Sequence, residues 1–220
     1  MEDAQLVYDI TVRQNGRERD LTIATSGTLL SKQLFPNEVS AAIQNTIQAH
    51  LGDGKLQRID RTLEEGETFF EVEFRKNGRD RSISISPEGK LVGAQVFLDE
   101  LPPPAQKSIQ SQTATGKLDR IDRTVEDGEV FYEIEWTQAG RDREFSVDGT
   151  GKIRSVRVAP AETPEPVRKA INGVLSKAAL VRIDKIFDSD GTSYEVALLR
   201  QGKKVVLSID EDGTVDEADK

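Results

Sequence analysis

The stretch KLDRIDRTVEDGEVFYEIEWTQAGRDREFSVDGTG, residues 117–151, decides the fold. It contains three strand-like runs separated by two glycine-containing turns. In the middle run Tyr132, Ile134 and Trp136 alternate with Glu133 and Glu135. Strict alternation of this kind predicts a strand with one face on a hydrophobic core and the other face in water. The stretch therefore predicts an antiparallel meander.

Nearly the same stretch recurs along the chain with a period of 62 residues. The period joins the aromatic positions Tyr8, Phe70, Tyr132 and Tyr194, and the turn positions Gly27, Gly89, Gly151 and Gly213. Internal periodicity indicates a repeat architecture. We predict three complete copies preceded by a partial copy that lacks its first half. The predicted units are residues 1–35, which form three strands and no helix, and residues 36–101, 102–162 and 163–220.

Each complete copy is predicted to begin with a helix. Val39, Ile43 and Ile47 recur at helical spacing, and Thr163 is placed as the N-cap of the third helix. The prolines Pro36 and Pro102 lie 66 residues apart rather than 62, which predicts a four-residue insertion after the first helix. Four strands follow each helix. The fold class is therefore α+β, with tandem repeats of one helix packed on a four-stranded antiparallel meander sheet.

The composition limits the partners and cofactors. A net charge of −9 disfavours nucleic acid and anionic membranes, because both need clustered cations. The absence of cysteine excludes disulfides and thiolate zinc sites. No run approaches the 18 apolar residues of a membrane span, so we expect no membrane insertion. We also expect no cofactor. The oligomeric state is left open.

Several short motifs resemble the PepSY-like family, including its β-lactamase-inhibitor-like branch. They are Leu101-Pro102 and Thr163-Pro164 before short helices, Gly116-Lys117-Leu118, the "DG-x-x-YEV" pattern at residues 128–134 and 191–196, and the "D-x-D-G-x-V" turn at residues 210–215. The resemblance covers nearly the whole chain as repeats. It implies an exported, non-enzymatic protein, secreted or located in the periplasm or cell envelope, that binds or inhibits peptidases or other hydrolases.

Arginines at the hairpins form the first set of candidate binding residues: Arg79, Arg81, Arg141 and Arg143. Together with the equivalent Arg17-Glu18-Arg19 they form three basic hairpin tips in a row, which would grip a carboxylate-bearing partner through bidentate contacts. Alternatively they are solvated charges that protect strand edges, which is the interpretation we favour.

The second set lies on the predicted wet face of the sheet. We expect Arg58, Arg120 and Arg182 to lie near Glu71, Glu133 and Glu195 on the neighbouring strands. Such cross-strand pairs contribute only about 0.2–1 kcal/mol each, so they would equally well define an extended polar binding surface. Phe69 and Phe131 share this face. They serve either as aromatic anchors of an interface or as packing against a neighbouring unit.

Catalytic motifs are missing from the sequence. There is no nucleophile elbow, glycine-rich phosphate loop or HExxH, and carboxylates on regular strands give no reason for a raised pKa. The acidic turns between the strands do not match the calcium-binding loop of an EF-hand. That loop needs a glutamate at position 12, and counted from Asp188 this position is Leu199. Turn geometry explains them adequately, although weak divalent-cation binding stays open.

We therefore predict a non-enzymatic binding module, outside the cell or in its envelope, for a protein partner of unknown identity. It would bind or inhibit a peptidase or other hydrolase through sheet faces and hairpin tips. The alternative is a structural or spacer array with no dedicated ligand.

Overall fold

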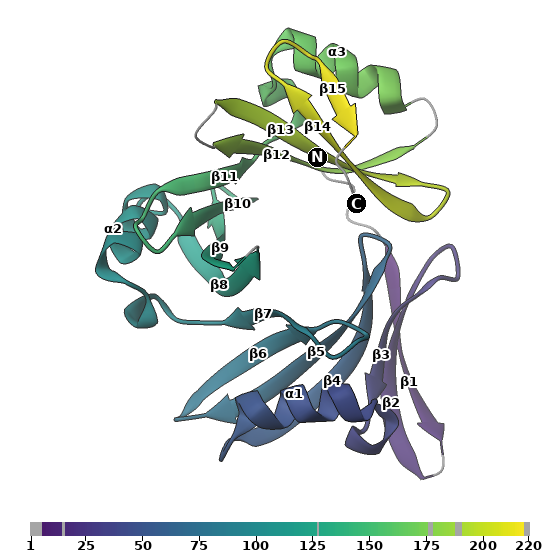
Figure 1. Cartoon of the computed structure of the whole chain (residues 1–220). Helices are drawn as coiled ribbons and strands as arrows, with labels where there is room; N and C mark the ends of the chain where they lie inside the picture. The colour runs from purple at the N-terminus through teal and green to yellow at the C-terminus, as the bar shows by residue number, and fades with distance from the viewer. Residues whose placement is uncertain (1–5, 15, 127, 176–177, 188–190, 218–220) are drawn as a thin grey trace. The chain divides into compact units, whose positions relative to one another are not determined.

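The computed structural model describes residues 6–14, 16–126, 128–175, 178–187 and 191–217. The chain forms two compact units, Met1–Gln95 and Val96–Lys220. Each unit is an antiparallel sheet whose strands pair in sequence order, with α-helices on the sheet (Figure 1). The boundaries between the four units inferred from the repeat stay a prediction.

The first unit is a seven-stranded meander with one α-helix among its described residues. A 3₁₀ turn at Pro36–Glu38 and helix α1 (Ala41–Leu51) lie between its third and fourth strands. The strands are β1 (Val7–Gln14), β2 (Arg17–Ala24), β3 (Leu29–Leu34), β4 (Lys55–Glu64), β5 (Glu67–Lys76), β6 (Arg79–Ile85) and β7 (Leu91–Gln95).

The described residues of the second unit form two α-helices, α2 (Pro103–Gln112) and α3 (Glu165–Val174). A 3₁₀ turn precedes each of them, at Leu98–Glu100 and Pro160–Glu162. The strands are β8 (Lys117–Glu126), β9 (Glu129–Gln138), β10 (Arg141–Asp148), β11 (Ile153–Arg157), β12 (Ala179–Phe187), β13 (Thr192–Arg200), β14 (Lys203–Asp210) and β15 (Val215–Glu217).

Each helix covers one face of the strands that follow it. In the first unit Ile43 and Ile47 of α1 pack with Ile59, Val72 and Ile83 in one buried cluster. Equivalent clusters in the second unit join α2 to β8–β10 and α3 to β12–β14. The apolar side chains that alternate along the strands thus point at a helix, as their period predicts.

Trp136 lies in the α2 cluster, as its core-facing phase predicts. Its ring meets the ring of Phe145 edge-on, with 4.9 Å between the centroids. Such T-shaped pairs add to the stabilisation that burial alone provides.

The predicted insertion after the first helix is wrong. The three 3₁₀ turns begin at residues 36, 98 and 160, and the three helices begin at residues 41, 103 and 165. The 62-residue spacing is therefore unbroken. Pro36 opens a 3₁₀ turn whereas Pro102 is the N-cap of α2, so the two prolines are not equivalent.

Thr163 is not the N-cap of α3, because that position belongs to Pro164. The Thr163 hydroxyl instead donates to the carbonyl of Pro160 at 2.8 Å, within the preceding 3₁₀ turn. The prediction failed because it did not anticipate these turns. Each turn carries a glutamate at its third residue whose carboxylate accepts the backbone N–H just before the turn.

The sheet is not divided into separate four-stranded blocks. Strand β3, which ends the partial copy, pairs with β4 of the next copy from Ser31↔Thr62 to Leu34↔Ile59. Likewise β11 pairs with β12 in the second unit. Since strand edges pair wherever a partner is available, consecutive copies share one antiparallel ladder within each unit.

The hairpin turns follow the expected geometry. The Asn15-Gly16 pair between the first two strand-like runs predicts a type I′ turn, and its Asn15 lies outside the described residues. The equivalent turn between β5 and β6 places Asn77 at φ +52° and Gly78 at φ +76°. A type I′ turn needs positive φ at both positions, which favours Asn-Gly.

Candidate functional site

An arginine–aspartate pair recurs on the helix-free face of the sheet. Residues i and i+2 of a strand share a face, so the Arg-Ile-Asp signature places its arginine beside its aspartate. Arg58 Nε lies 2.5 Å from Asp60 Oδ2, and Arg182 Nε lies 2.8 Å from Asp184 Oδ2. The equivalent pair on β8 is Arg120 with Asp122.

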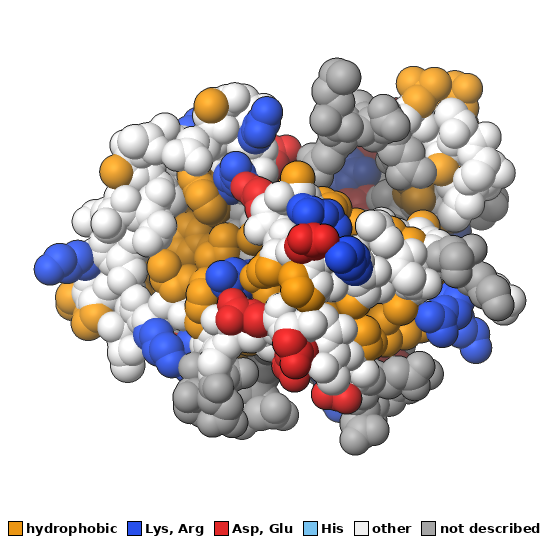
Figure 2. Space-filling view, turned by 90° about the horizontal axis from the view of Figure 1, so that it is seen from above, with side chains coloured by type: hydrophobic (Ala, Val, Ile, Leu, Met, Phe, Trp, Pro, Cys, Tyr) orange, Lys and Arg blue, Asp and Glu red, His pale blue; other side chains and the backbone are white. Residues whose placement is uncertain are grey.

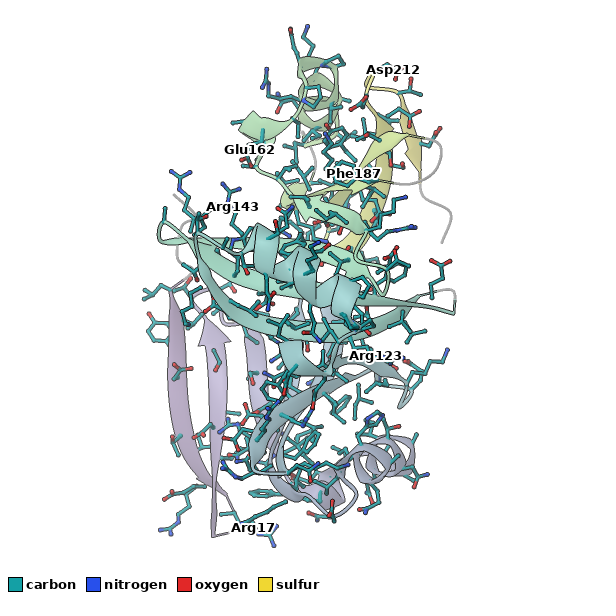
Figure 3. The ribbon with its side chains drawn as sticks, turned by 90° about the vertical axis from the view of Figure 1, so that its left-hand side faces the viewer. Arg17, Arg123, Arg143, Glu162, Phe187 and Asp212 are labelled. Carbon is teal, nitrogen blue, oxygen red and sulfur yellow. The ribbon has the colours of Figure 1, made fainter. Side chains whose placement is uncertain are left out.

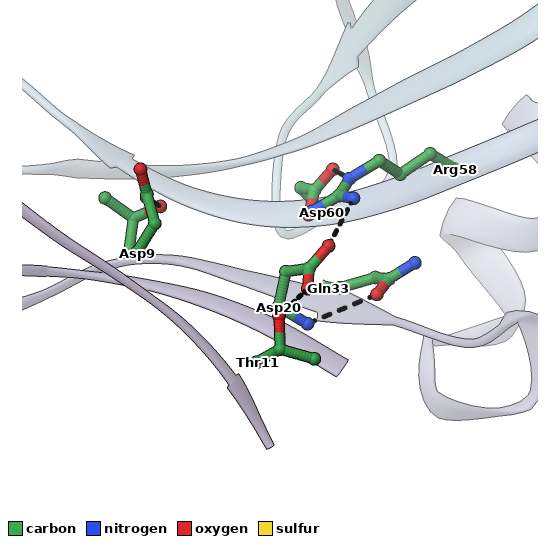
Figure 4. A network of polar contacts seen from close by, with 7 residues as sticks. Asp9, Thr11, Asp20, Gln33, Arg58 and Asp60 are labelled. Atoms are coloured by element: carbon green, nitrogen blue, oxygen red, sulfur yellow. Dashed lines mark hydrogen bonds and ion pairs between the residues drawn. The ribbon is translucent and has the colours of Figure 1, made fainter. Parts of the chain in front are cut away.

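In the first unit this pair belongs to a wider polar network (Figure 4). Arg58 Nη1 donates to Asp20 Oδ2 at 2.9 Å, and the Thr11 hydroxyl donates to Asp20 Oδ1 at 2.9 Å. The Asp20 backbone N–H donates to Gln33 at 3.3 Å. The Arg58 guanidinium holds the pKa of Asp20 below its ordinary value, and both aspartates raise the pKa of Arg58. The network connects β1 to β4 through β2 and β3.

In the second unit the same face is hollowed into a polar groove of about 230 Å³. Strands β8 to β13 contribute its lining. Its charged residues include Glu133, Glu144, Arg154, Arg157, Arg182 and Asp184, and Phe131 also lines it. We call this site the groove.

Arg157 occupies the centre of the groove between two carboxylates. Its Nη2 donates to Glu144 Oε1 at 2.8 Å, and its Nε donates to Asp184 Oδ1 at 3.4 Å. Burial raises the pKa of the Glu144 carboxyl to about 7, because the attraction of Arg157 is not enough to offset the loss of water. The expectation that no carboxylate has a raised pKa is therefore wrong at Glu144.

One hydroxyl in the groove has no partner. Thr124 is 8% exposed, and its Oγ1 finds no hydrogen-bond partner among the described residues. A buried hydroxyl without a partner costs free energy unless water or a ligand supplies one. Thr124 therefore marks a point at which a bound group would gain a hydrogen bond.

The glutamates predicted to lie near the wet-face arginines are not directly opposite them, but two residues away along the neighbouring strand. Arg58 lies opposite Glu73 rather than Glu71, and Glu71 lies opposite Asp60. The same register places Arg120 opposite Glu135 and Asp122 opposite Glu133. The two-residue turn fixes this register by pairing Glu64 with Glu67, a constraint that the expectation overlooked.

Phe69 and Phe131 are both half-buried. Only Phe131 lies in the groove, where the Arg154 guanidinium carbon is 5.7 Å from the ring centroid. Phe69 faces Thr62 on β4 in the first unit. The structure thus distinguishes two residues that the sequence presents as equivalent.

The hairpin arginines have different environments. Arg79 and Arg141 are exposed, whereas Arg81 and Arg143 are half-buried. Arg143 Nη1 lies 3.3 Å from Glu162 Oε1 (Figure 3), and Arg79 and Arg81 each have an interaction partner. Whether these four arginines bind a partner protein stays a prediction.

The groove residues that sequence reasoning missed include Thr124, Glu144, Arg154 and Arg157. Of these, Glu144, Arg154 and Arg157 depart from the repeat, because Ser82, Val92 and Gln95 occupy these positions one period earlier. Departures from an otherwise regular repeat were therefore the available signal.

Charges of both signs are interspersed on the face that Figure 2 shows. Among the described residues, no group of three or more Asp, Glu or His side chains is placed to hold a metal ion. Asp127 and residues 188–190 of the acidic turns lie outside the described residues. In the described part of the chain, no helix is long and apolar enough to cross a membrane.

These features define a helix-covered antiparallel meander with an ion-paired polar groove. Solved structures with a similar fold include a DUF2874 family protein from Bacteroides uniformis, 15% identical, with a TM-score of 0.39 over 52% of this chain and 86% of that one. Another DUF2874 family protein, from Bacteroides ovatus, is 16% identical with a TM-score of 0.39 over 52% and 84%.

A protein from Bacteroides eggerthii described as periplasmic is 13% identical, with a TM-score of 0.40 over 52% of this chain and 85% of that one. No family model matches the sequence, and no curated protein matches it. The comparisons therefore give no PepSY assignment.

Proposed function

We propose that this chain is a non-enzymatic binding module, built of tandem repeats of a helix on a four-stranded meander, that engages a protein partner through the groove. A location outside the cell or in its envelope belongs to the same proposal. The observation that carries it is the pairing within the groove, where Arg157 and Arg182 are held by Glu144 and Asp184.

This pairing favours binding over catalysis. A general acid or base needs a proton to give or take within reach of a substrate, and a perturbed pKa by itself also arises in structural ion-pair networks. Glu144 is held by Arg157, and two hydroxyls that line the groove, those of Ser146 and Ser155, bond to each other at 2.6 Å. The arrangement offers polar groups of both signs, which suit the mixed charges of a protein surface.

Phe131 would supply the apolar anchor of the contact. Aromatic side chains at the centre of an interface carry a large share of binding free energy. Arg154 over the ring and the free hydroxyl of Thr124 would supply directional contacts beside it. A segment of the partner crossing the groove would meet all three.

The test is a binding and inhibition assay against a panel of purified peptidases and other hydrolases of the bacterial envelope. We expect binding in the micromolar range or tighter, and a loss of about tenfold or more in affinity for Phe131→Ala. Phe69→Ala is the matched control, since it removes the equivalent ring outside the groove. Absence of binding at high micromolar concentrations, or equal losses for both variants, would contradict the proposal.

A spacer array is the second candidate, and the ladders β3–β4 and β11–β12 favour it because they tie consecutive copies together. It predicts that neutralising Arg79, Arg81, Arg141 and Arg143 leaves the function in the cell intact. It also predicts that Phe131→Ala has no effect there.

A further inference from the structure

Strands β1–β3 carry an apolar face that no helix among the described residues of the first unit covers. It consists of Tyr8, Ile10 and Val12 on β1 with Leu21 and Ile23 on β2, and we call it the open face. Tyr8 lies opposite Ile23 and Ile10 lies opposite Leu21, so these side chains share one side of the sheet. Tyr8 is 53% exposed and Ile10 is 40% exposed.

The open face is the same side that the helices cover elsewhere. Leu21 lies opposite Lys32 on β3, and Leu34, two residues further along β3, lies opposite Ile59. Ile59 packs with α1 in the buried cluster of the first unit. The open face therefore continues the helix-covered face beyond the reach of α1.

The repeat shows what belongs on this face. One, two and three periods after Ile10 stand Val72, Ile134 and Val196, and each of them is 0% exposed. One period after Leu21 and Ile23 stand Ile83 and Ile85, which are 2% and 0% exposed. The partial copy keeps the apolar residues that a helix buries in every complete copy, but its described residues form no helix.

The turn after β2 leaves room for a helix. In complete copies the helix comes so close to the turn that a Cβ on Gly89 would lie 2.7 Å from Ala42, and one on Gly151 would lie 2.6 Å from the carbonyl of Pro104. Ala42 and Pro104 are one period apart, so the helices approach in the same way. A Cβ on Gly27 would meet nothing within 4 Å.

The described residues of the partial copy also do not include the strand that follows the helix in complete copies. Within each unit β5, β9 and β13 pair on one side with the strand that follows their helix, namely β4, β8 and β12. Strand β1, the equivalent of these strands, ends its sheet and pairs with β2 alone among the described strands. Its free edge is open to pairing.

From the helix-sized space and the free edge together, we infer that the open face and the β1 edge bind an amphipathic helix followed by a strand, supplied by another polypeptide segment of the repeat type. The helix carries apolar side chains four residues apart, as Val39, Ile43 and Ile47 do on α1. On α1 the Thr46 hydroxyl donates to the carbonyl of Gly89 at 2.6 Å. A hydroxyl at the equivalent position of the bound helix would donate to the carbonyl of Gly27. The strand adds antiparallel to β1 with an isoleucine opposite Ile10, as Ile59 lies opposite Val72.

The probe is a synthetic peptide of residues 36–64, which contains the 3₁₀ turn, α1 and β4. Titration into the full chain, followed by calorimetry and by backbone NMR shifts, is expected to show saturable binding centred on β1 and β2. Ile10→Lys on the chain is expected to weaken binding by about tenfold or more, because it places a charge beneath the helix. Thr11→Lys is the matched control, since it adds the same charge to the opposite face of β1.

A peptide carrying Ile43→Asp and Ile47→Asp tests the helix side of the contact and is expected not to bind. Since Ile10 is already exposed, the Ile10→Lys chain should melt as the wild type does, so loss of binding is not a loss of folding. No shift on β1 at millimolar peptide, or equal binding by the Ile10→Lys chain, would overturn the inference. A chain that sediments as a dimer, with Ile10→Lys monomeric, would also overturn it and assign the face to a second copy.

Discussion

Arg19 on β2 and Glu38 in the 3₁₀ turn before α1 form an ion pair with 2.7 Å between Nη2 and Oε1. The pair joins the partial copy to the first complete copy. Glu38 also accepts the backbone N–H of Phe35 at 2.8 Å, and the Arg19 guanidinium lies over the Phe35 ring. Arg143 and Glu162, two repeat periods later, form the same contact, with Glu162 accepting the N–H of Ala159. Hairpin arginines therefore form a recurring ion pair with the 3₁₀ turn that precedes a helix, and so hold that turn against the sheet.

Replacing Arg19 tests this fastening. Because Arg19 is 7% exposed and donates to a carboxylate, Arg19→Ala is expected to lower the free energy of unfolding by about 1–3 kcal/mol. Arg13→Ala, at an exposed position of β1, should change it by less than about 0.5 kcal/mol. Urea denaturation of the two variants makes the comparison. Equal effects would mean that the ion pair has no structural role.

The pKa of Glu38 gives the same contact a pH dependence. Arg19 and the Phe35 N–H lower this pKa, so the stabilisation is present above the ordinary pKa of the carboxyl and is lost as the pH falls through the lowered value. In Arg19→Ala the loss of stability on acidification should be smaller than in the wild type. Thermal melting between pH 3 and pH 6 measures the difference.

Matched glycine variants test the approach of α1 to the turn after β6. Gly89 and Gly27 both have φ +86°, so alanine at either position carries a left-handed backbone cost of about 1–2 kcal/mol. Only at Gly89 does the added Cβ also meet Ala42. Gly89→Ala should therefore be less stable than Gly27→Ala by a further amount of about 1–3 kcal/mol in urea denaturation. Equal losses would show that the helix does not approach the turn as described.

Glu144 predicts a second pH effect, of opposite sign. Its carboxyl has a pKa of about 7 in the folded chain against an ordinary 4.5, so the folded state holds a proton that the unfolded state releases. The free energy of unfolding should fall as the pH rises through this window, by about 2 kcal/mol relative to Glu144→Gln. Urea denaturation of both proteins at several pH values checks this, and parallel curves would refute it.

The sequence predicted the strands well, because their alternation and their turns are local signals. The phase that buries Ile134 and Trp136 follows directly from the spacing of the residues. The spacing does not predict which strands pair across a copy boundary. The pairing of β3 with β4 depends on where the helix between them places the returning chain. The 3₁₀ turns were not predicted because proline occurs at two different positions before the helices. Pro36 begins a 3₁₀ turn, whereas Pro102 is the N-cap of an α-helix.

The site was less predictable than the fold. The repeat drew attention to Arg58, Arg120 and the hairpin arginines, whereas the groove depends on Glu144 and Arg157, which break the repeat. The raised pKa of Glu144 comes first from burial of its carboxyl, which only the folded sheet produces and no local pattern in the sequence indicates. The exposure of Tyr8 and Ile10 was also missed, because alternation indicates an apolar face and does not show what covers it.

A pair of equivalent isoleucines tests the open face by stability alone. Ile134 is fully buried beneath α2, so Ile134→Ala should lower the free energy of unfolding by about 2–5 kcal/mol. Ile10, two periods earlier, is 40% exposed, and Ile10→Ala should cost less than about 1 kcal/mol. A large loss at Ile10 would mean that its side chain is covered in the free chain.

Residue-resolved amide hydrogen exchange, with and without the peptide of residues 36–64, tests the central claim most directly. In the free chain the amides of β1 should exchange about 100-fold faster than those of β5 and β9, because β1 has no covering helix and pairs with β2 alone among the described strands. The peptide should slow exchange in β1 and leave β9 unchanged. Strong protection of β1 in the free chain, or exchange that the peptide does not alter, would contradict the account.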